Sequence, residues 1–476
     1  MRETGIMRMT PSEAVMWAVE KDPALRSDFA NITVLDRVPS ERRLHTTIQR
    51  ALAAMPRLGE RVVSPPLRIA PPEWRPDPTF DVDYHLRRVA IPEPGSMRGM
   101  LDVAASVTAP PLDRSRPLWE FTVVEGLDGG RAALIQRMHH TITDGVGGMK
   151  LSLSLVDLER EPAADALGAI RELNDDVETS RRDAHSDDPV DRDSPLDIVR
   201  EAIAFSAGQT AELTRRALGA SVMTLARPRQ LPAAAKRSVE LLRSLRRQVL
   251  ITDRGHSEMF ANRSLARRYD TLALDLDPLH RAGKAHGASV NDVFVTGVAR
   301  ALAHFHREFG ETVDTLRMAM PVSTRDRGDF TPNRFAPSRI LVPVSDGEPA
   351  EHLAHVHDAV HNVRSEPALD AADLLAAITA GVPTAALVSL FRAQTRTIDF
   401  ATSNLRGSPV DLYLGGGRIE ASYPMGPRAG VPVNVTMMSY CGELHLGIHS
   451  DPAAVIDPDL LVECLRNAFV ELAALG

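Results

Sequence analysis

Two adjacent histidines, followed by an aspartate and a glycine, are the residues whose types and spacing best suit chemistry. They are His139, His140, Asp144 and Gly145 in the stretch RMHHTITDG. Histidine titrates near pH 6.5, so a neutral imidazole can take a proton from a hydroxyl or thiol and return it to a leaving group. One imidazole is therefore a candidate general base. Asp144 can hold the turn that follows, where Gly145 permits a positive φ.

The residues that lead to the histidine pair alternate between apolar and polar. This pattern over residues 131–140 predicts a strand. Adjacent residues of a strand point to opposite faces, so His139 and His140 cannot both enter one pocket. We expect one imidazole to react and the other to pack.

Three other chemistries fit parts of this region less well. Zinc would need a third ligand, and the histidines of residues 352–361 divide between opposite faces of a helix. Residues 145–150, GVGGMK, begin like a dinucleotide-binding fingerprint, but Lys150 stands where its third glycine belongs. No G-x-S-x-G nucleophile elbow occurs, so the usual serine-hydrolase mechanism lacks its serine. Metal and nucleotide chemistry remain weaker alternatives.

Length and composition indicate a globular protein with two large lobes. The chain has 476 residues, of which 43% are hydrophobic and 25% charged. A net charge of −8 argues against a protein that mainly binds nucleic acid through its phosphates. Cys441 and Cys464 form no spaced cluster, and the N-terminal residues lack the apolar run of a signal peptide. A reducing, cytoplasmic location is expected.

Three segments stand out along the chain. Residues 174–195 are rich in acids and poor in apolar residues, which predicts an exposed linker. Residues 215–250 carry nine Arg or Lys against one acid, with leucines at helical spacing. They predict a basic amphipathic helix that either packs on a lobe or lies on a membrane surface. Leu374–Phe391 lacks charges, but Gly381 and Pro383 interrupt it, which favours two buried helical pieces over a membrane span.

The second half also mixes strands and helices. Residues 317–324, 339–345 and 431–440 read as strands, and residues 288–310 read as a helix that ends at Gly310. We therefore predict an α/β fold with a lobe over residues 1–173, a linker and basic helix over 174–260, and a second lobe over 261–476.

Four ordered motifs resemble those of the bacterial wax ester synthase/diacylglycerol acyltransferases, in the HHxxxDG superfamily of acyl-CoA-dependent acyltransferases. The Pro-Leu-Trp element precedes the histidine motif, and after it come an Asn-Asp motif within SVNDVFVTGVARAL (residues 289–302) and matches within MPVSTR (320–325) and TSNLRG (402–407). The residues concerned, outside the histidine motif, are Pro117, Leu118, Trp119, Asn291, Asp292, Arg325, Ser403 and Asn404. Trp119 has a structural alternative as a core residue, and Asn291 as a helix cap.

The resemblance implies two chloramphenicol-acetyltransferase-like lobes joined by a linker, with the active site between them. It implies that His140 is the general base, that His139 supports it, and that Asp144 orients the loop, with Arg325 as one candidate partner. The reaction implied is ester formation from acyl-CoA and a fatty alcohol or diacylglycerol, with no cofactor. The enzyme would be cytoplasmic, peripheral on the inner membrane or on lipid droplets.

Two departures from the family pattern lie in the second half. Arg406 follows Leu405 where the family usually has Pro after Val, and Pro332 precedes Asn333 where Gly is usual. They bear on the shape of the acyl or acceptor channel. Two alternative functions remain: an acyltransferase of the same superfamily that uses a carrier-bound donor for another lipid or polyketide hydroxyl, and a non-catalytic acyl-lipid binding protein. A carrier has no need of a base, which disfavours the second.

Overall fold

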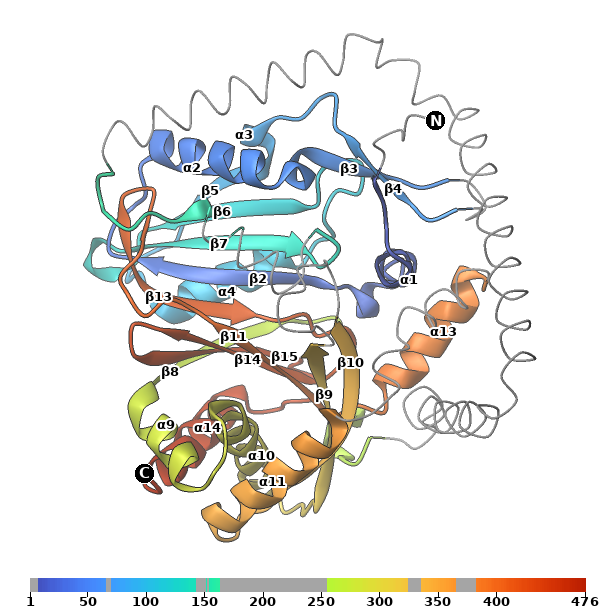
Figure 1. The fold of residues 1–476 in the computed structure, drawn as a ribbon, viewed down its shortest axis with the longest axis vertical. Helices are drawn as coiled ribbons and strands as arrows, with labels where there is room; N and C mark the ends of the chain where they lie inside the picture. The colour runs from blue at the N-terminus through green and yellow to red at the C-terminus, as the bar shows by residue number, and fades with distance from the viewer. Residues whose placement is uncertain are drawn as a thin grey trace, which may run out of the picture.

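The histidine pair lies at the end of a strand in a mixed α/β fold. The computed structural model describes residues 7–65, 70–142, 151, 154–162, 255–323, 335–364 and 382–476. Within these residues the strands form two six-stranded sheets and one three-stranded sheet. Figure 1 shows the two large sheets one above the other, with helices above the first and below the second. The predicted α/β class is confirmed.

The first sheet carries the histidine pair on a central strand. Its strands, in spatial order, are β12 (Tyr413–Leu414), β13 (Gly417–Met425), β2 (Asp28–Leu35), β7 (Ala132–His139), β6 (Trp119–Glu125) and β5 (Leu86–Ala90). Neighbours pair antiparallel except β5 and β6. All eight residues of β7 are buried. The predicted strand over residues 131–140 is therefore correct, and its end is fixed by pairing on both sides.

Alternation along β7 sends side chains into two different cores. Leu134 and Met138 pack in the cluster that contains helix α2 (Glu41–Ala54). Ile135 packs in the cluster that contains helix α4 (Met97–Thr108). This period of two is what a strand buried on both faces imposes, and it carries through to the histidines at its end.

The second sheet is built from the second half of the chain. Its strands, in spatial order, are β10 (Phe335–Pro343), β9 (Thr315–Ser323), β11 (Phe400–Arg406), β14 (Val433–Tyr440), β15 (Glu443–Ser450) and β8 (Arg268–Asp275). Strand β11 runs parallel to both of its neighbours. The helices on its outer side are α9 (Leu276–Ala285), α10 (Val290–Glu308), α11 (Pro349–Arg364) and α14 (Pro458–Ala473).

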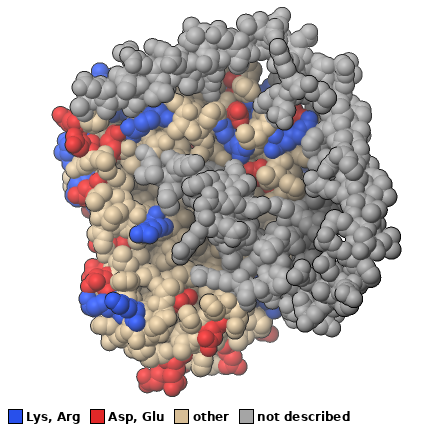
Figure 2. All heavy atoms as spheres, in the orientation of Figure 1, with Lys and Arg blue, Asp and Glu red and all other residues tan. Residues whose placement is uncertain are grey.

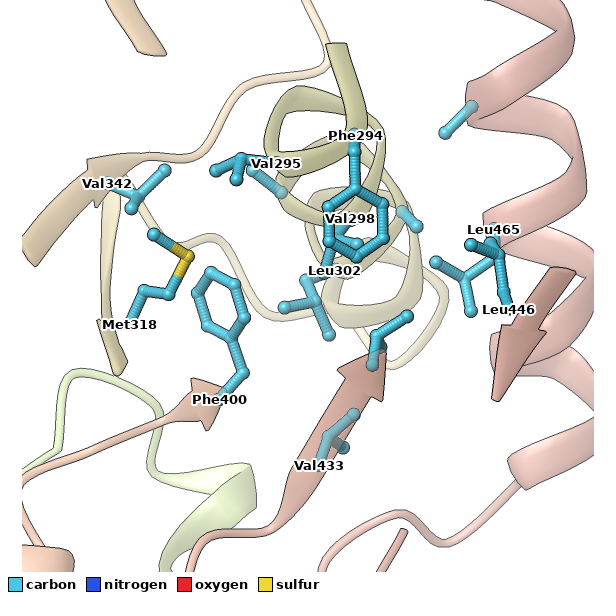
Figure 3. Close-up of a cluster of buried hydrophobic side chains, with 14 of the residues drawn as sticks. Phe294, Val295, Val298, Leu302, Met318, Val342, Phe400, Val433, Leu446 and Leu465 are labelled. Carbon is cyan, nitrogen blue, oxygen red and sulfur yellow. The ribbon is translucent and has the colours of Figure 1, made fainter. Parts of the chain in front are cut away.

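The largest hydrophobic cluster joins this sheet to its helices (Figure 3). Phe294 and Leu302 of α10 and Leu465 of α14 meet Phe400 of β11 and Leu446 of β15. All five side chains are buried. Removal of so much apolar surface from water is the main stabilising contribution to this half of the chain.

Helix α10 follows the sequence prediction closely. Ser289 caps its first turn by accepting the N–H of Asp292, while the Asp292 carboxylate accepts the N–H of Ser289. The helix ends just before Gly310, whose φ of +76° suits the turn that follows. Ser289 therefore holds the cap position that the sequence suggested as an alternative role for Asn291.

The two halves of the chain share a sheet. Strand β13, from the second half, pairs antiparallel with β2 in the first sheet and is the long strand of that sheet nearest the second sheet in Figure 1. Gly447 of β15 allows the close approach, since a Cβ there would lie 2.0 Å from the carbonyl oxygen of Pro424 in β13. Buried Asp28 in β2 also accepts hydrogen bonds from Arg137 of β7 and from Arg267. Arg267 directly precedes β8 of the second sheet. The halves are thus joined by strand pairing and by buried charge.

A small sheet and several short helices complete the described structure. The three-stranded sheet contains β1 (Met7–Arg8), β4 (Glu73–Pro76) and β3 (Glu60–Val63). The short helices nearby are α1 (Pro11–Val19) and α3 (Val82–His85), and single 3₁₀ turns are η1 (Pro23–Leu25), η2 (Pro56–Gly59), η4 (Asp128–Gly130) and η6 (Met259–Ala261).

Helix α13 (Thr384–Thr395) contains part of the uncharged stretch noted in the sequence. It packs against α1, as Figure 1 shows, and only Leu387 and Gln394 on it are buried. The expected burial of this piece therefore holds for one face alone, because α1 covers one side of the helix. None of the described helices is both long enough and apolar enough to cross a membrane.

Two predicted segments lie outside the described residues: the acidic linker of 174–195 and the basic helix within 215–250. The division at residues 174–260 stays a prediction. On the face drawn in Figure 2, described Lys and Arg side chains lie in separate small groups among Asp and Glu.

Candidate active site

The two histidines at the end of β7 have different surroundings. His139 is buried, and its ring meets Trp17 edge-on with centroids 6.0 Å apart. Its Nε2 lies 2.5 Å from Oε2 of Glu20. The His140 ring instead meets Phe29 of β2, at 5.4 Å between centroids. The strand thus delivers the imidazoles to two sides, as its alternation requires.

His140 is half-buried at the point where the chain leaves the sheet. Burial lowers the pKa of His140 to about 4; neighbouring His139 adds to the lowering, and Glu20 opposes it. Burial disfavours the charged form of an imidazole because the cation loses hydration. At neutral pH the side chain is therefore an uncharged imidazole, the form that can accept a proton.

The turn after His140 is held by several hydrogen bonds. The N–H of Thr141 donates to Nδ1 of His139 at 3.1 Å, and the N–H of Ile142 donates to the His139 carbonyl at 3.0 Å. Arg57 donates to the Thr141 carbonyl at 3.4 Å and also contacts Glu13. The backbone around His140 is thus fixed from its own strand and by Arg57 of η2, which Glu13 of α1 contacts.

The Pro-Leu-Trp element supports the same strand end from the neighbouring strand. Pro117, Leu118 and Trp119 are all buried, and the Leu118 carbonyl accepts the N–H of His139 at 3.0 Å. The indole N–H of Trp119 donates to the Leu58 carbonyl at 2.8 Å. These contacts place the element in the core beside the histidines.

The second-half motifs are brought together at the start of α10. The side-chain amide of Asn404 on β11 donates to Oδ1 of Asn291 at 3.3 Å. Nδ2 of Asn291 is buried and makes no hydrogen bond with the part of the chain that the structure describes. Asp292 also contacts His357 on α11 at 3.0 Å, and Ser403 precedes Asn404 in β11. Residues 113 positions apart thus meet through the packing of α10 on the second sheet.

Some predicted site residues lie outside the described residues. They are Asp144, Gly145 and Arg325, together with Pro332 of the departures. Arg406 ends β11, where its side chain is exposed. Among the described residues no group of three or more His, Cys, Asp or Glu is arranged to hold a metal ion.

Glu20 is a buried site neighbour that sequence reasoning missed. It follows α1 directly, and its side chain is only 8% exposed. With Trp17 it lines a cleft of about 40 Å³ that also includes Arg26, Arg114 and His139. One signal was available in the sequence: Glu20 lies three residues after Trp17, on the same face of the N-terminal helix.

Comparison with known proteins places the whole chain in one family. Residues 9–294 match the wax ester synthase/diacylglycerol acyltransferase catalytic domain, and residues 332–473 match the C-terminal domain of the same family. A Mycobacterium tuberculosis protein that carries the name diacylglycerol O-acyltransferase is 31% identical over 98% of this chain and 91% of its own.

Solved structures show the same fold. The wax ester synthase/diacylglycerol acyltransferase of Marinobacter aquaeolei VT8 matches with a TM-score of 0.61 at 19% identity, over 98% of each chain. The starter condensation domain of rhizomide synthetase, in complex with C8-CoA, matches with a TM-score of 0.56 at 13% identity, over 99% of this chain and 94% of its own. The expected two-lobed architecture is thereby confirmed, and the chain belongs to the wax ester synthase/diacylglycerol acyltransferase family of acyltransferases.

Proposed function

We propose that this protein transfers the acyl group of an acyl-CoA to the hydroxyl of a fatty alcohol or diacylglycerol, with His140 as general base. The observation that carries the proposal is His140 itself. It directly follows a buried central strand, keeps partial access to solvent, and is uncharged at neutral pH because burial lowers its pKa to about 4. A positioned, neutral imidazole is what proton removal from an alcohol requires.

The proposed reaction needs a single base. His140 takes the hydroxyl proton as the alcohol oxygen attacks the thioester carbonyl, and a tetrahedral intermediate forms. The carbon–sulfur bond then breaks, and the imidazolium of His140 returns its proton to the departing CoA thiolate. An ester and free CoA result. The chemistry uses only the two substrates, so we propose no cofactor.

The acyl-CoA donor has support from two sources. Family membership connects the chain with acyl transfer to lipid hydroxyls, and the condensation domain of the same fold binds C8-CoA. Asn291 and Asn404 are proposed to line the substrate side of the second half, where the buried Nδ2 of Asn291 is a donor with no hydrogen-bond partner among the described residues. Trp119 and its neighbours are proposed to act structurally, through the strand end that they support.

We also propose cytoplasmic action at a membrane or lipid-droplet surface. Support comes from the sequence of residues 215–250, whose basic charge suits anionic lipid. Flotation with anionic vesicles should capture the protein at low salt and release it at high salt. Capture that survives high salt would contradict a peripheral, electrostatic attachment.

A product assay tests the reaction. Palmitoyl-CoA is offered with hexadecanol, with dipalmitin, and in parallel a carrier-bound palmitoyl donor replaces the CoA ester. Ester formation from palmitoyl-CoA should fall by roughly 10²- to 10⁴-fold in His140→Ala, the usual contribution of a general base. Ester formed only from the carrier-bound donor, or undiminished turnover in His140→Ala, would overturn the proposal.

A further inference from the structure

A buried carboxylate connects helix α1 to the histidine pair. The side chains of Glu20 and His139 are 8% and 4% exposed, and Oε2 of Glu20 lies 2.5 Å from Nε2 of His139. The second carboxylate oxygen, Oε1, accepts the backbone N–H of Ser27 at 2.6 Å. Glu20 therefore bridges the chain that enters β2 and the side chain that ends β7.

The hydrogen bonds of His139 determine where its proton lies. Nδ1 accepts the backbone N–H of Thr141 at 3.1 Å and lies 2.7 Å from the Thr141 hydroxyl, which can also donate to it. A nitrogen that accepts this N–H carries no proton of its own. Nε2 must then be protonated, since an unprotonated nitrogen 2.5 Å from a carboxylate oxygen would oppose two lone pairs. The contact with Glu20 is bent away from ideal hydrogen-bond geometry, and it is attractive only in this tautomer.

The side chain of His139 thus links the backbone before His140 to the backbone after it. Its own backbone precedes His140, and the Thr141 N–H that it accepts follows His140. A change in the ring orientation of His139 would release that N–H and let the His140 backbone turn. Glu20 holds the ring in place from a different element of the fold.

We propose that Glu20 is a positioning residue for His140 and acts through the imidazole of His139. The proposal rests on the proposed role of His140 as general base. Trp17 packs on the His139 ring, and Arg114 stacks over Trp17 at 3.3 Å from its centroid, so the pair is held in a packed setting.

Charge provides independent support. Burial, the largest influence, lowers the pKa of His140, and the Glu20 carboxylate acts in the opposite direction. Glu20 therefore limits the loss of basicity that burial imposes on the base. A stronger base removes a hydroxyl proton more readily in the transition state.

The structure also explains why a carboxylate is needed. Both oxygens of Glu20 face N–H donors, one from Ser27 and one from His139. In Glu20→Gln one of these donors would meet an NH₂ group, which cannot accept a hydrogen bond. The substitution has the same size but removes both the charge and one contact.

Two variants break the contact between Glu20 and His139, and a third variant is the control. Glu20→Gln breaks it at the carboxylate. His139→Asn breaks it at the ring, because the asparagine oxygen can replace Nδ1 toward Thr141 but cannot reach Glu20. Asp22→Asn is the matched control, since Asp22 is a buried acid two residues further on, paired with Arg392 of α13 rather than with a histidine.

The measurements are kcat, KM for palmitoyl-CoA, and melting temperature, with hexadecanol as acceptor and assays well below each melting temperature. Glu20→Gln and His139→Asn should each lower kcat by roughly tenfold, with KM within about twofold, because the base is displaced while CoA is held elsewhere. The double variant should lose little more than either single one. Asp22→Asn should lower the melting temperature and leave kcat within about twofold.

A normal kcat in Glu20→Gln, together with an inactive His140→Ala, would overturn this proposal and leave the general base intact. Multiplicative losses in the double variant would also overturn it, since the two residues would then act independently. Full activity in His140→Ala would instead remove the proposed function on which it rests.

Discussion

The pH dependence of the reaction offers a stringent test of the site, because burial sets the pKa of His140 to about 4. Neutral imidazole is the active form of a general base, so a lowered pKa extends activity toward acid. With an ordinary pKa of about 6.5, only about 9% of molecules would be active at about pH 5.5. With a pKa of about 4, roughly 97% remain neutral. Activity at that pH should therefore stay near its neutral value rather than fall about tenfold.

The assay must exclude other titrating groups. We would measure kcat/KM for hexadecanol, which does not ionise, at saturating palmitoyl-CoA, so that protonation of the CoA phosphates has little effect. The ester should be quantified by chromatography, because thiol reagents react slowly at acid pH. Melting temperature, followed at each pH, identifies any loss that comes from unfolding.

A fall of kcat/KM to one half near pH 6.5, with an unchanged melting temperature, would refute the reasoning. It would mean that the reacting imidazole is hydrated like an ordinary surface histidine, or that another group is the base. A fall that begins only near pH 4 to 5, at an unchanged melting temperature, would agree with a buried base.

Three further predictions concern stability. Asp28→Asn should cost roughly 3 kcal/mol near pH 7, because the buried Arg137 and the partly buried Arg267 lose their counter-ion. Burial acts to raise the pKa of Asp28, but these two arginines hold it below its ordinary value. The ionised Asp28 carboxylate contributes to the free energy of unfolding above about pH 4, and this contribution is lost as the pH falls through its lowered pKa. The denaturation midpoints of variant and wild type should therefore converge in acid. A difference that stays constant with pH would contradict this. Gly447→Ala should destabilise by about 1–3 kcal/mol, since its Cβ would meet the Pro424 carbonyl, and an unchanged denaturation midpoint would mean that the sheets separate easily. Trp119→Phe should cost about 1 kcal/mol through the lost bond to Leu58 and leave KM within about twofold, whereas a large rise in KM at normal stability would place the indole against substrate.

The sequence alone determined the features that depend on neighbouring residues. Alternation over residues 131–140 predicted strand β7, and that period of two placed His139 and His140 in different surroundings. Helical spacing predicted α10 to within two residues at each end. Local patterns predict these elements because buried positions recur at a fixed spacing along each helix or strand, and that spacing can be read from consecutive residues.

The tertiary structure alone decided which distant segments meet. The pairing of β13 with β2, and the contact of Asn404 with Asn291, depend on how the second half folds back. Nothing in local spacing specifies such partners, because many registers satisfy the same alternation and packing selects one. The lowered pKa of His140 likewise arises from burial, which no single stretch of sequence records. Glu20 reaches His139 for the same reason: 119 residues separate them, and only the packing of α1 against the end of β7 brings that carboxylate to the imidazole.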